Sequence, residues 1–372
     1  MPTLSIDELR RLIRKMEFDK TEPELLVDLV HKAMESGEGE KKRLKRIIEK
    51  SDGLFKFLAD NNLFCYIKGN EDTMEGFKKI PVGAVDGSFQ VVGGRGGKWF
   101  AILGISQIIA DKGFTLNPTV KVDGFIEPLE AVDEADAHKK SEIVMFLGEI
   151  KATRRIAEQF SLKGESYILV DGPVVDPPLY MDENYIDDRV EAFKFCSKNN
   201  VGIIGFVKRI MGSEYLNFIK KEFKIESVDE FANDLDLLST VMFVAAKTIT
   251  CPVYTYPLSC SEAGDMACAY KIYKEKGLNV YYSYYKPNLR SKIYRVEYAS
   301  PKELSRTEVA EIYSKIFILL NKVWTLTGLS EPLPIIIAHN KCNVRQGAAE
   351  KLYYEIMTRA LSEGEINFWL ES

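Results

Sequence analysis

Two aspartates that follow short apolar runs are the residues of this chain best suited to chemistry. Asp86 comes after the run 82–85, Asp171 comes after the run 167–170, and each is followed by glycine. An apolar run closed by glycine predicts a buried strand that reaches a turn. A carboxylate at the end of such a strand is costly to desolvate unless a basic side chain or a metal ion neutralises it.

The two aspartates together indicate a metal site. Carboxylate oxygens are the ligands that Mg²⁺ and Mn²⁺ prefer, and two carboxylates at strand ends can converge on one cation. Asp-Gly is also an ordinary turn sequence, and for either motif by itself that interpretation is at least as good. For the pair, with these flanks, we favour metal binding.

The motifs AVDGS around Asp86 and LVDGP around Asp171, with Ala338-His339 near the C-terminus, resemble those of the NurA nuclease family. The resemblance runs from Val82 to His339. It implies a ribonuclease H-like α/β core, a mixed sheet flanked by helices. It also implies a metal-dependent nuclease that resects DNA ends beside a hexameric HerA-type ATPase.

The resemblance also implies a set of metal ligands. Asp86 and Asp171 would be joined by a glutamate of the helix predicted between them, where Glu149 has the most apolar surroundings. Glu142 and Glu158 remain alternatives. Such sites hold Mn²⁺ or Mg²⁺, and two ions about 4 Å apart would clamp the attacking and leaving oxygens of a phosphodiester.

His339 is the remaining expected site residue. It follows the apolar run 335–337, which predicts a short strand, and histidine can ligate a metal or carry a proton near neutral pH. One departure from the family stands nearby, because Glu331 occupies a region where a tyrosine is expected. Another tyrosine can take that role, the role can be dispensable, or activity can be reduced.

Basic and aromatic side chains are candidates for contacts with DNA. Lys208, Arg209, Lys341 and Arg345 could meet phosphates. The tyrosines of 281–285 could stack on unpaired bases, although tyrosines in a strand more often pack against neighbouring strands.

The predicted elements divide the chain into a helical N-terminal arm, residues 1–62, and a nuclease domain, residues 63–372. Apolar runs predict strands at 100–110, 120–125 and 201–207, and a helical pattern covers 141–160. The glycine-rich stretch 93–97 predicts a hairpin turn. It lacks the pattern of a phosphate-binding loop.

Composition limits the class of protein. A hydrophobic content of 46%, with 28% charged residues, suits a folded chain with a charged surface, and no apolar run reaches the length of a membrane span. We expect a cytoplasmic protein without a membrane segment. The net charge of −5 is unlike that of a protein that coats DNA, so a partner could supply part of the attraction.

The leading hypothesis is a deoxyribonuclease with single-strand endonuclease and 5′→3′ exonuclease activity. By resemblance it would resect DNA ends for recombinational repair, act as a homodimer and work with a HerA-type ATPase. The alternatives are a catalytically impaired NurA-like subunit that docks or guides DNA, and an unrelated phosphatase or kinase-like enzyme. The last is weakened by the missing phosphate loop and nucleophile motif.

Overall fold

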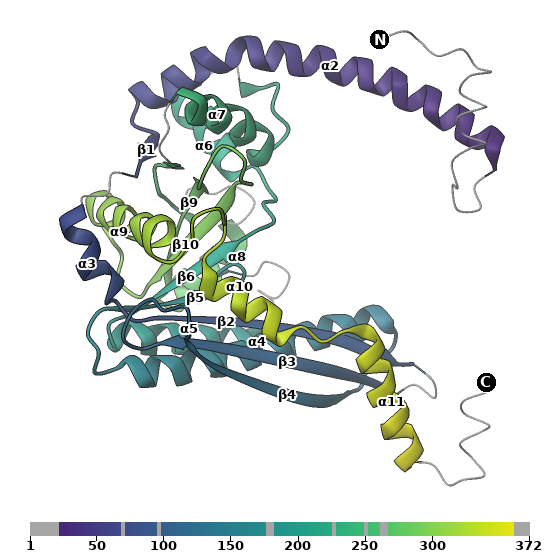
Figure 1. Ribbon diagram of the computed structural model, residues 1–372. Helices are drawn as coiled ribbons and strands as arrows, with labels where there is room; N and C mark the ends of the chain where they lie inside the picture. Colours follow the sequence, from purple (N-terminus) through teal and green to yellow (C-terminus); the bar gives the residue numbers. More distant parts are fainter. Residues whose placement is uncertain are drawn as a thin grey trace.

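The computed structural model describes residues 22–67, 71–94, 98–175, 182–224, 228–248, 252–260 and 267–360. The first part of the predicted N-terminal arm, residues 1–21, lies outside these residues. Within the described ranges the chain forms a mixed sheet with helices on both faces (Figure 1). The expected α/β architecture is therefore confirmed.

The strands of this sheet differ greatly in length, and the longest form the β2–β3–β4 ribbon. They are β1 (Phe64–Tyr66), β2 (Val82–Gly93), β3 (Trp99–Ala110), β4 (Thr119–Leu129), β5 (Ser166–Val170), β6 (Val201–Val207), β7 (Val253–Thr255), β8 (Leu258–Ser259), β9 (Asn279–Lys286) and β10 (Tyr294–Ser300).

The helices range from eight residues in α3 to 38 residues in α2. They are α2 (Pro23–Asp60), α3 (Glu71–Lys78), α4 (Glu134–Phe160), α5 (Glu183–Lys198), α6 (Glu214–Phe223), α7 (Asp234–Thr248), α8 (Ala267–Glu275), α9 (Arg306–Ile318), the π-helical turn η5 (Leu319–Val323), α10 (Leu333–Cys342) and α11 (Gln346–Ala360).

The strand order of the sheet places the two aspartate-bearing segments side by side. The order is β1-β7-β9-β10-β6-β5-β2-β3-β4, with β8 paired to β9. β5 is parallel to both β2 and β6, and the other pairs are antiparallel. The parallel pairing requires crossovers, which α4 and α5 provide. As a result, the carboxyl end of β5 lies beside the middle of β2.

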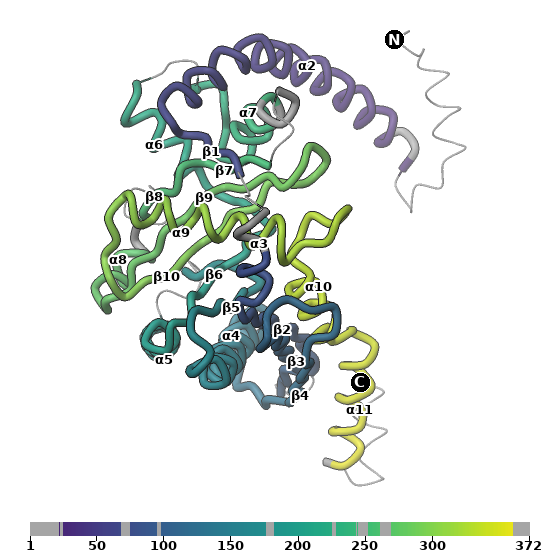
Figure 2. Tube along the Cα trace, turned by 60° about the vertical axis from the view of Figure 1, so that its left-hand side comes forward, coloured from purple at the N-terminus to yellow at the C-terminus, as the bar shows by residue number. Residues whose placement is uncertain are grey.

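Two helical layers cover the sheet and define two cores. The face covered by α4 and α5 buries residues such as Ile156, Phe160 and Ile186 against the strands. The opposite face buries residues of α9, η5 and α10, including Phe317, Trp324 and Ile335. Figure 2 shows α4 and α10 on opposite sides of β2. The apolar runs of β5 and β6 reflect this, because strands covered on both faces need no polar alternation.

Two local predictions are wrong. The run 335–337 was expected to be a strand but belongs to α10, which begins just after Pro332 and carries Pro334 in its first turn, where proline is tolerated. Asp86 was expected at a strand end, but β2 continues to Gly93 because β3 pairs with it along its whole length. The predicted hairpin is confirmed by the pairing of Gly93 with Trp99, while 95–97 lie outside the described residues.

Candidate metal centre

Asp86 lies where the parallel pairing of β2 ends. β5 pairs with β2 only as far as Val85, whose carbonyl accepts a hydrogen bond from the Asp171 N–H at 3.2 Å. Asp86 is therefore the first residue of β2 beyond its parallel neighbour, at the point where the sheet opens. The residue remains only 5% exposed, because β3 and α10 cover it.

Asp171 begins the turn that follows β5. Gly172 adopts a φ of +148°, a region that disfavours side chains, and its carbonyl packs against Gly205 of β6. A Cβ at position 205 would lie 2.8 Å from that carbonyl oxygen. Glycine at these two positions therefore lets the chain turn sharply after Asp171 while the carboxylate stays beside Asp86.

His339 is positioned by α10, which is fastened to the sheet next to Asp86. The Ser106 hydroxyl of β3 donates to the Ala338 carbonyl at 2.8 Å, and the Ser88 hydroxyl of β2 donates to the Cys342 carbonyl at 2.5 Å. Gly104 allows the end of the helix to approach β3, since a side chain there would collide with the Cys342 carbonyl. The imidazole is thus held over β2 by backbone contacts on either side of it.

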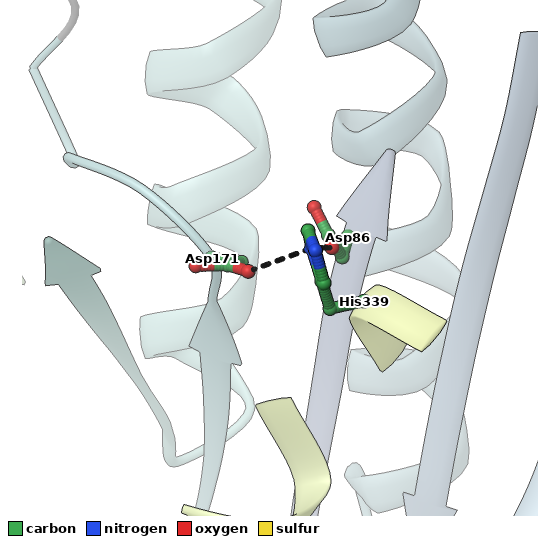
Figure 3. A group of neighbouring side chains, drawn as sticks. All are labelled: Asp86, Asp171 and His339. Atoms are coloured by element: carbon green, nitrogen blue, oxygen red, sulfur yellow. Dashed lines mark hydrogen bonds and ion pairs between the residues drawn. The ribbon is translucent and has the colours of Figure 1, made fainter. Parts of the chain in front are cut away.

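The three side chains converge from three elements (Figure 3). His339 Nδ1 lies 2.9 Å from Asp86 Oδ2 and 3.6 Å from Asp171 Oδ2. One ligand atom from each residue falls within 4.8 Å of the others. The aspartate side chains are only 8% and 10% exposed, whereas the histidine side chain is 60% exposed. The group therefore combines two buried carboxyl groups with an accessible imidazole.

Burial weakens the acidity of both aspartates. Burial, together with the charge of Asp171, raises the pKa of Asp86 to about 6, against the opposing effect of the His339 contact. Burial also raises the pKa of Asp171, although the neighbouring Lys208 ammonium works in the opposite direction. Two buried carboxylates this close favour the binding of a cation.

Lys208 supplies a positive charge inside this group. Its Nζ lies 2.7 Å from Asp171 Oδ2 and 3.3 Å from Glu331 Oε2. Burial acts to lower the pKa of Lys208, but the two carboxylates outweigh it and raise the pKa above its usual value. Glu331, at the place where a tyrosine was expected, is thus the second partner of this lysine. The hydroxyl of Tyr294 lies 3.4 Å from Glu331 Oε1, so a tyrosine does reach this position from β10.

Glu149 approaches Asp86 from the face of the sheet that α4 covers, opposite the face covered by α10. It is 4% exposed, on α4, and its Oε1 lies 2.9 Å from the place where a Cβ of Gly87 would stand. The glycine after Asp86 therefore makes room for this carboxylate. Of the alternatives, Glu142 is half-buried two turns earlier, and Glu158 is exposed beside Asp123 and Arg155. Glu149, expected as the third carboxylate ligand, lies outside the group formed by Asp86, Asp171 and His339, and its role as a ligand stays a prediction.

A cavity of about 720 Å³ opens on the aspartates and the histidine. Lys208 and Arg209, expected to contact DNA, line it, and so do Arg295 and Glu214, which sequence reasoning missed. Lys341 and Arg345 are exposed at and after the end of α10, and neither is part of the cavity lining. The tyrosines of 281–285 are at most 4% exposed, so they pack within the sheet and are not available to stack on bases.

The sequence did contain a signal for one of the missed residues, Arg295. Arg295 and Glu297 are charged residues two positions apart in a strand, so they share one face of it. They form a buried ion pair, with Arg295 Nε 2.7 Å from Glu297 Oε1. A charged pair with this spacing in an otherwise apolar strand indicates a buried polar network.

Comparison with known proteins identifies the family. The family model for the NurA domain matches residues 81–344, a span that contains the whole group of aspartates and histidine. The chain belongs to the NurA family. Among curated protein sequences, none matches it.

Solved structures show the same fold. The crystal structure of the NurA nuclease from Sulfolobus solfataricus matches with a TM-score of 0.55 and 15% identity, covering 92% of this chain and 99% of that one. A structure of NurA with manganese matches with a TM-score of 0.46 and 12% identity, covering 90% of this chain and 100% of that chain. Human endonuclease V matches with a TM-score of 0.36 and 13% identity, over 82% and 99% of the two chains. The first of these matches shows that the chain shares the fold of that NurA nuclease.

The donor set of this NurA site fits a divalent cation. Carboxylate oxygens of Asp86 and Asp171 and the imidazole of His339 are hard or borderline ligands of the kind that bind Mn²⁺ and Mg²⁺. The charge of Asp171 raises the proton affinity of Asp86, as expected where a cation is the natural counter-charge. Asp86, Asp171 and His339 could hold the metal, with Glu149 close behind Gly87.

Proposed function

We propose that this protein is a metal-dependent DNA nuclease. The observation that carries the proposal is the convergence of Asp86, Asp171 and His339, within the region matched by the NurA family, on a cavity lined by basic residues. Mn²⁺ or Mg²⁺, as two ions, is the expected cofactor. When bound, such cations polarise the phosphate and activate water for attack.

The residues of the chain would divide the remaining work. Asp86 and Asp171 hold the cations, with Glu149 supporting them. Lys208 and Arg209 would neutralise the phosphates of the strand in the cavity. His339, the most exposed member of the group, is placed to take up or release a proton at its imidazole as the phosphodiester is cleaved.

An isosteric substitution tests this proposal. Asp86→Asn should reduce cleavage of single-stranded DNA in Mn²⁺ by at least a hundredfold while the protein stays folded, because the amide keeps the shape and lacks the charge. Asp123→Asn, at an exposed carboxylate of β4, is a matched control and should cut at the wild-type rate. An Asp86→Asn protein that cuts DNA as fast as the wild type would refute the site assignment.

The same assay separates the catalytic proposal from a catalytically impaired NurA-like subunit. A wild-type protein that binds DNA but does not cut it in Mn²⁺ or Mg²⁺ would support a docking or DNA-guiding role. We favour the enzyme because both aspartates and the histidine are in contact distance of one another.

The substrate and partner belong to the same proposal. We expect single-strand endonuclease and 5′→3′ exonuclease activity, used by a homodimer in the cytoplasm to resect DNA ends for recombinational repair with a HerA-type hexameric ATPase. In the described part of the chain, no helix is long and apolar enough to cross a membrane.

A translocating ATPase should stimulate cleavage of duplex ends more than cleavage of short single strands, because only the duplex must be unwound. Equal stimulation of the two substrates, measured with ATP, would contradict this partnership.

A further inference from the structure

The cavity beside the metal centre is larger than a scissile phosphate needs. Its volume of about 720 Å³ lies in the range of pockets that enclose a whole small molecule. Asp86 and Asp171 line only part of it. From the aspartates, the cavity extends along the turn after β5 and reaches the loop after β6, residues 208–212.

The far part of the cavity combines apolar walls with cationic groups. Pro173 and Val175 line it on the β5 side, and Met211 lines it on the side of the loop. Arg209 belongs to the same loop and is exposed, while Arg295 is almost fully buried. Apolar side chains and guanidinium groups lining one cavity suit a flat, polar-edged ring attached to a phosphate.

Met211 is the least expected of these residues. It is 78% exposed, although a methionine is usually buried. The loop that carries it is held in place, because the Gly212 carbonyl accepts a hydrogen bond from the Asp234 N–H at 3.1 Å. Gly212 has a φ of +99°, and its α-carbon packs against the buried carboxyl group of Glu214. The loop therefore presents an apolar, polarisable side chain at a fixed place on the cavity.

We propose that the part of the cavity between Pro173, Val175 and Met211 is a subsite for one unstacked nucleobase of the DNA strand being cut. This inference rests on the proposed nuclease function and adds to it the residues that receive the base. The phosphate attached to this nucleotide lies toward the aspartates and the base lies against Met211. Arg209 neutralises a neighbouring phosphate.

The subsite has a consequence for the choice of substrate. A base can enter a pocket of this kind only after it has left the stack, which costs least in a single strand. The tyrosines of β9 are buried and cannot provide a stacking surface, so the contacts in this subsite come from Met211, Pro173 and Val175.

Binding of abasic DNA tests the subsite without cleavage. A single-stranded oligonucleotide that just fills the site is prepared with one abasic residue at each position in turn, and its affinity is measured in Ca²⁺. One position should bind the wild type about tenfold more weakly when abasic, because the contacts of the base with Met211, Pro173 and Val175 are lost. In Met211→Ala, intact and abasic oligonucleotides should bind with nearly equal affinity. Met34→Ala, at an exposed methionine of α2, is the matched control and should keep the difference.

The outcomes separate the subsite from the proposed function. A protein that binds and cuts DNA but shows the same affinity for every abasic oligonucleotide overturns the subsite alone. The subsite is equally overturned if Met211→Ala retains the wild-type discrimination. A wild-type protein that neither binds nor cuts DNA overturns the proposed function and the subsite together. Because Met211 is so exposed, its substitution should leave the melting temperature unchanged.

Discussion

At the scale of single residues, the carboxyl group of Asp86 is the most perturbed member of the metal centre. Its pKa of about 6 lies well above the ordinary value of 3.8, mainly because the side chain is buried and secondly because Asp171 is near. A cation must displace the proton that this group holds at lower pH. Binding of metal is therefore coupled to the protonation of the pair.

We predict that the affinity for Mn²⁺ rises with pH through about 6. Between pH 5 and pH 7.5 it should increase by about tenfold for the single proton of Asp86, since a pKa unit corresponds to a tenfold change in occupancy. The stability of the metal-free protein, in contrast, should fall as pH rises. The raised pKa makes the protonated form more stable in the folded state, so this contribution to stability is lost as pH rises from about 4 to 6.

Calorimetric titration of Mn²⁺ at the two pH values, beside thermal melting of the metal-free protein, checks both statements. Asp86→Asn should lose this part of the pH dependence of melting. An Mn²⁺ affinity that is flat from pH 5 to pH 7.5 would show that Asp86 does not bind the metal.

The sequence was sufficient to identify Asp86 and Asp171, because an apolar run before each aspartate marks a carboxylate that must be buried. It also pointed to His339, although on an element of the wrong type. It could not show that Lys208 pairs with Asp171 and Glu331, because these contacts join segments 37 and more residues apart. Lys208, which was expected to contact DNA, also lies within the acidic group.

At the scale of elements, the turn after β5 is the part of the scaffold that positions Asp171. Glu297 Oε2 accepts a hydrogen bond from the Val174 N–H at 2.6 Å, and the buried Arg189 donates to the Pro173 carbonyl at 2.5 Å. Glu297 is fully buried and is neutralised by Arg295. A buried ion pair thus fixes the backbone just beyond Asp171, a candidate metal ligand.

We predict that Glu297→Gln lowers stability by about 3 kcal/mol, because it leaves the Arg295 guanidinium buried without its counter-charge. It should also weaken Mn²⁺ binding, since the turn that carries Asp171 loses a charged anchor. The double variant Arg295→Met/Glu297→Gln should regain most of the stability, because it contains no unpaired charge. Denaturant unfolding and Mn²⁺ titration of both variants measure these effects. If Glu297→Gln leaves both stability and Mn²⁺ affinity unchanged, the ion pair does not position the turn.

Most elements of the core were predictable, and the exceptions have a physical reason. β5, β6 and α4 have apolar patterns long enough to determine their type. The run before His339 is too short to distinguish a strand from a buried helix, and only packing against Ser88 and Ser106 decides it. The length of β2 depends likewise on its pairing with β3, which is a non-local contact.

At the scale of the whole molecule, α2 is the feature that the rest of the fold explains least. Its C-terminal half is anchored by the pairing of Arg43 with Asp236 and of Lys50 with Glu230. Its N-terminal half extends away from the rest of the molecule (Figure 1). Leu25 and Leu29 are about half exposed on that half. A helix that carries exposed leucines at a spacing of four residues suits a partner surface.

We predict that Leu25→Asp/Leu29→Asp abolishes stimulation by the proposed ATPase. Cleavage of short single strands by the isolated protein should be unchanged, because these residues lie far from the metal centre. Leu162→Asp/Leu116→Asp, at two other exposed leucines, is the matched control and should keep the stimulation. If the first double variant is stimulated as strongly as wild type, the docking surface lies elsewhere, such as on the predicted C-terminal helix.

The arrangement of the whole sheet was beyond sequence reasoning. The domain boundary at residue 62 stays a prediction. α2 ends at Asp60, and β1 follows directly and pairs with β7, almost two hundred residues later. Such pairings depend on the shape of the complete sheet. The order of the motifs predicts the family and the centre of the fold, while the outer strands are determined by tertiary contacts.

The position of Lys208 has a consequence for how the protein responds to metal supply. The Lys208 ammonium already contacts Asp171 Oδ2. A metal ion that binds this oxygen must therefore compete with the ammonium. Glu331 remains as a second partner, so the displaced ammonium keeps a counter-charge. Chelators should therefore inactivate the protein without unfolding it. Neutralising Lys208 by Lys208→Met should make metal loading of the proposed nuclease effective at a lower Mn²⁺ concentration, which a titration of Mn²⁺ into the variant and the wild type would measure.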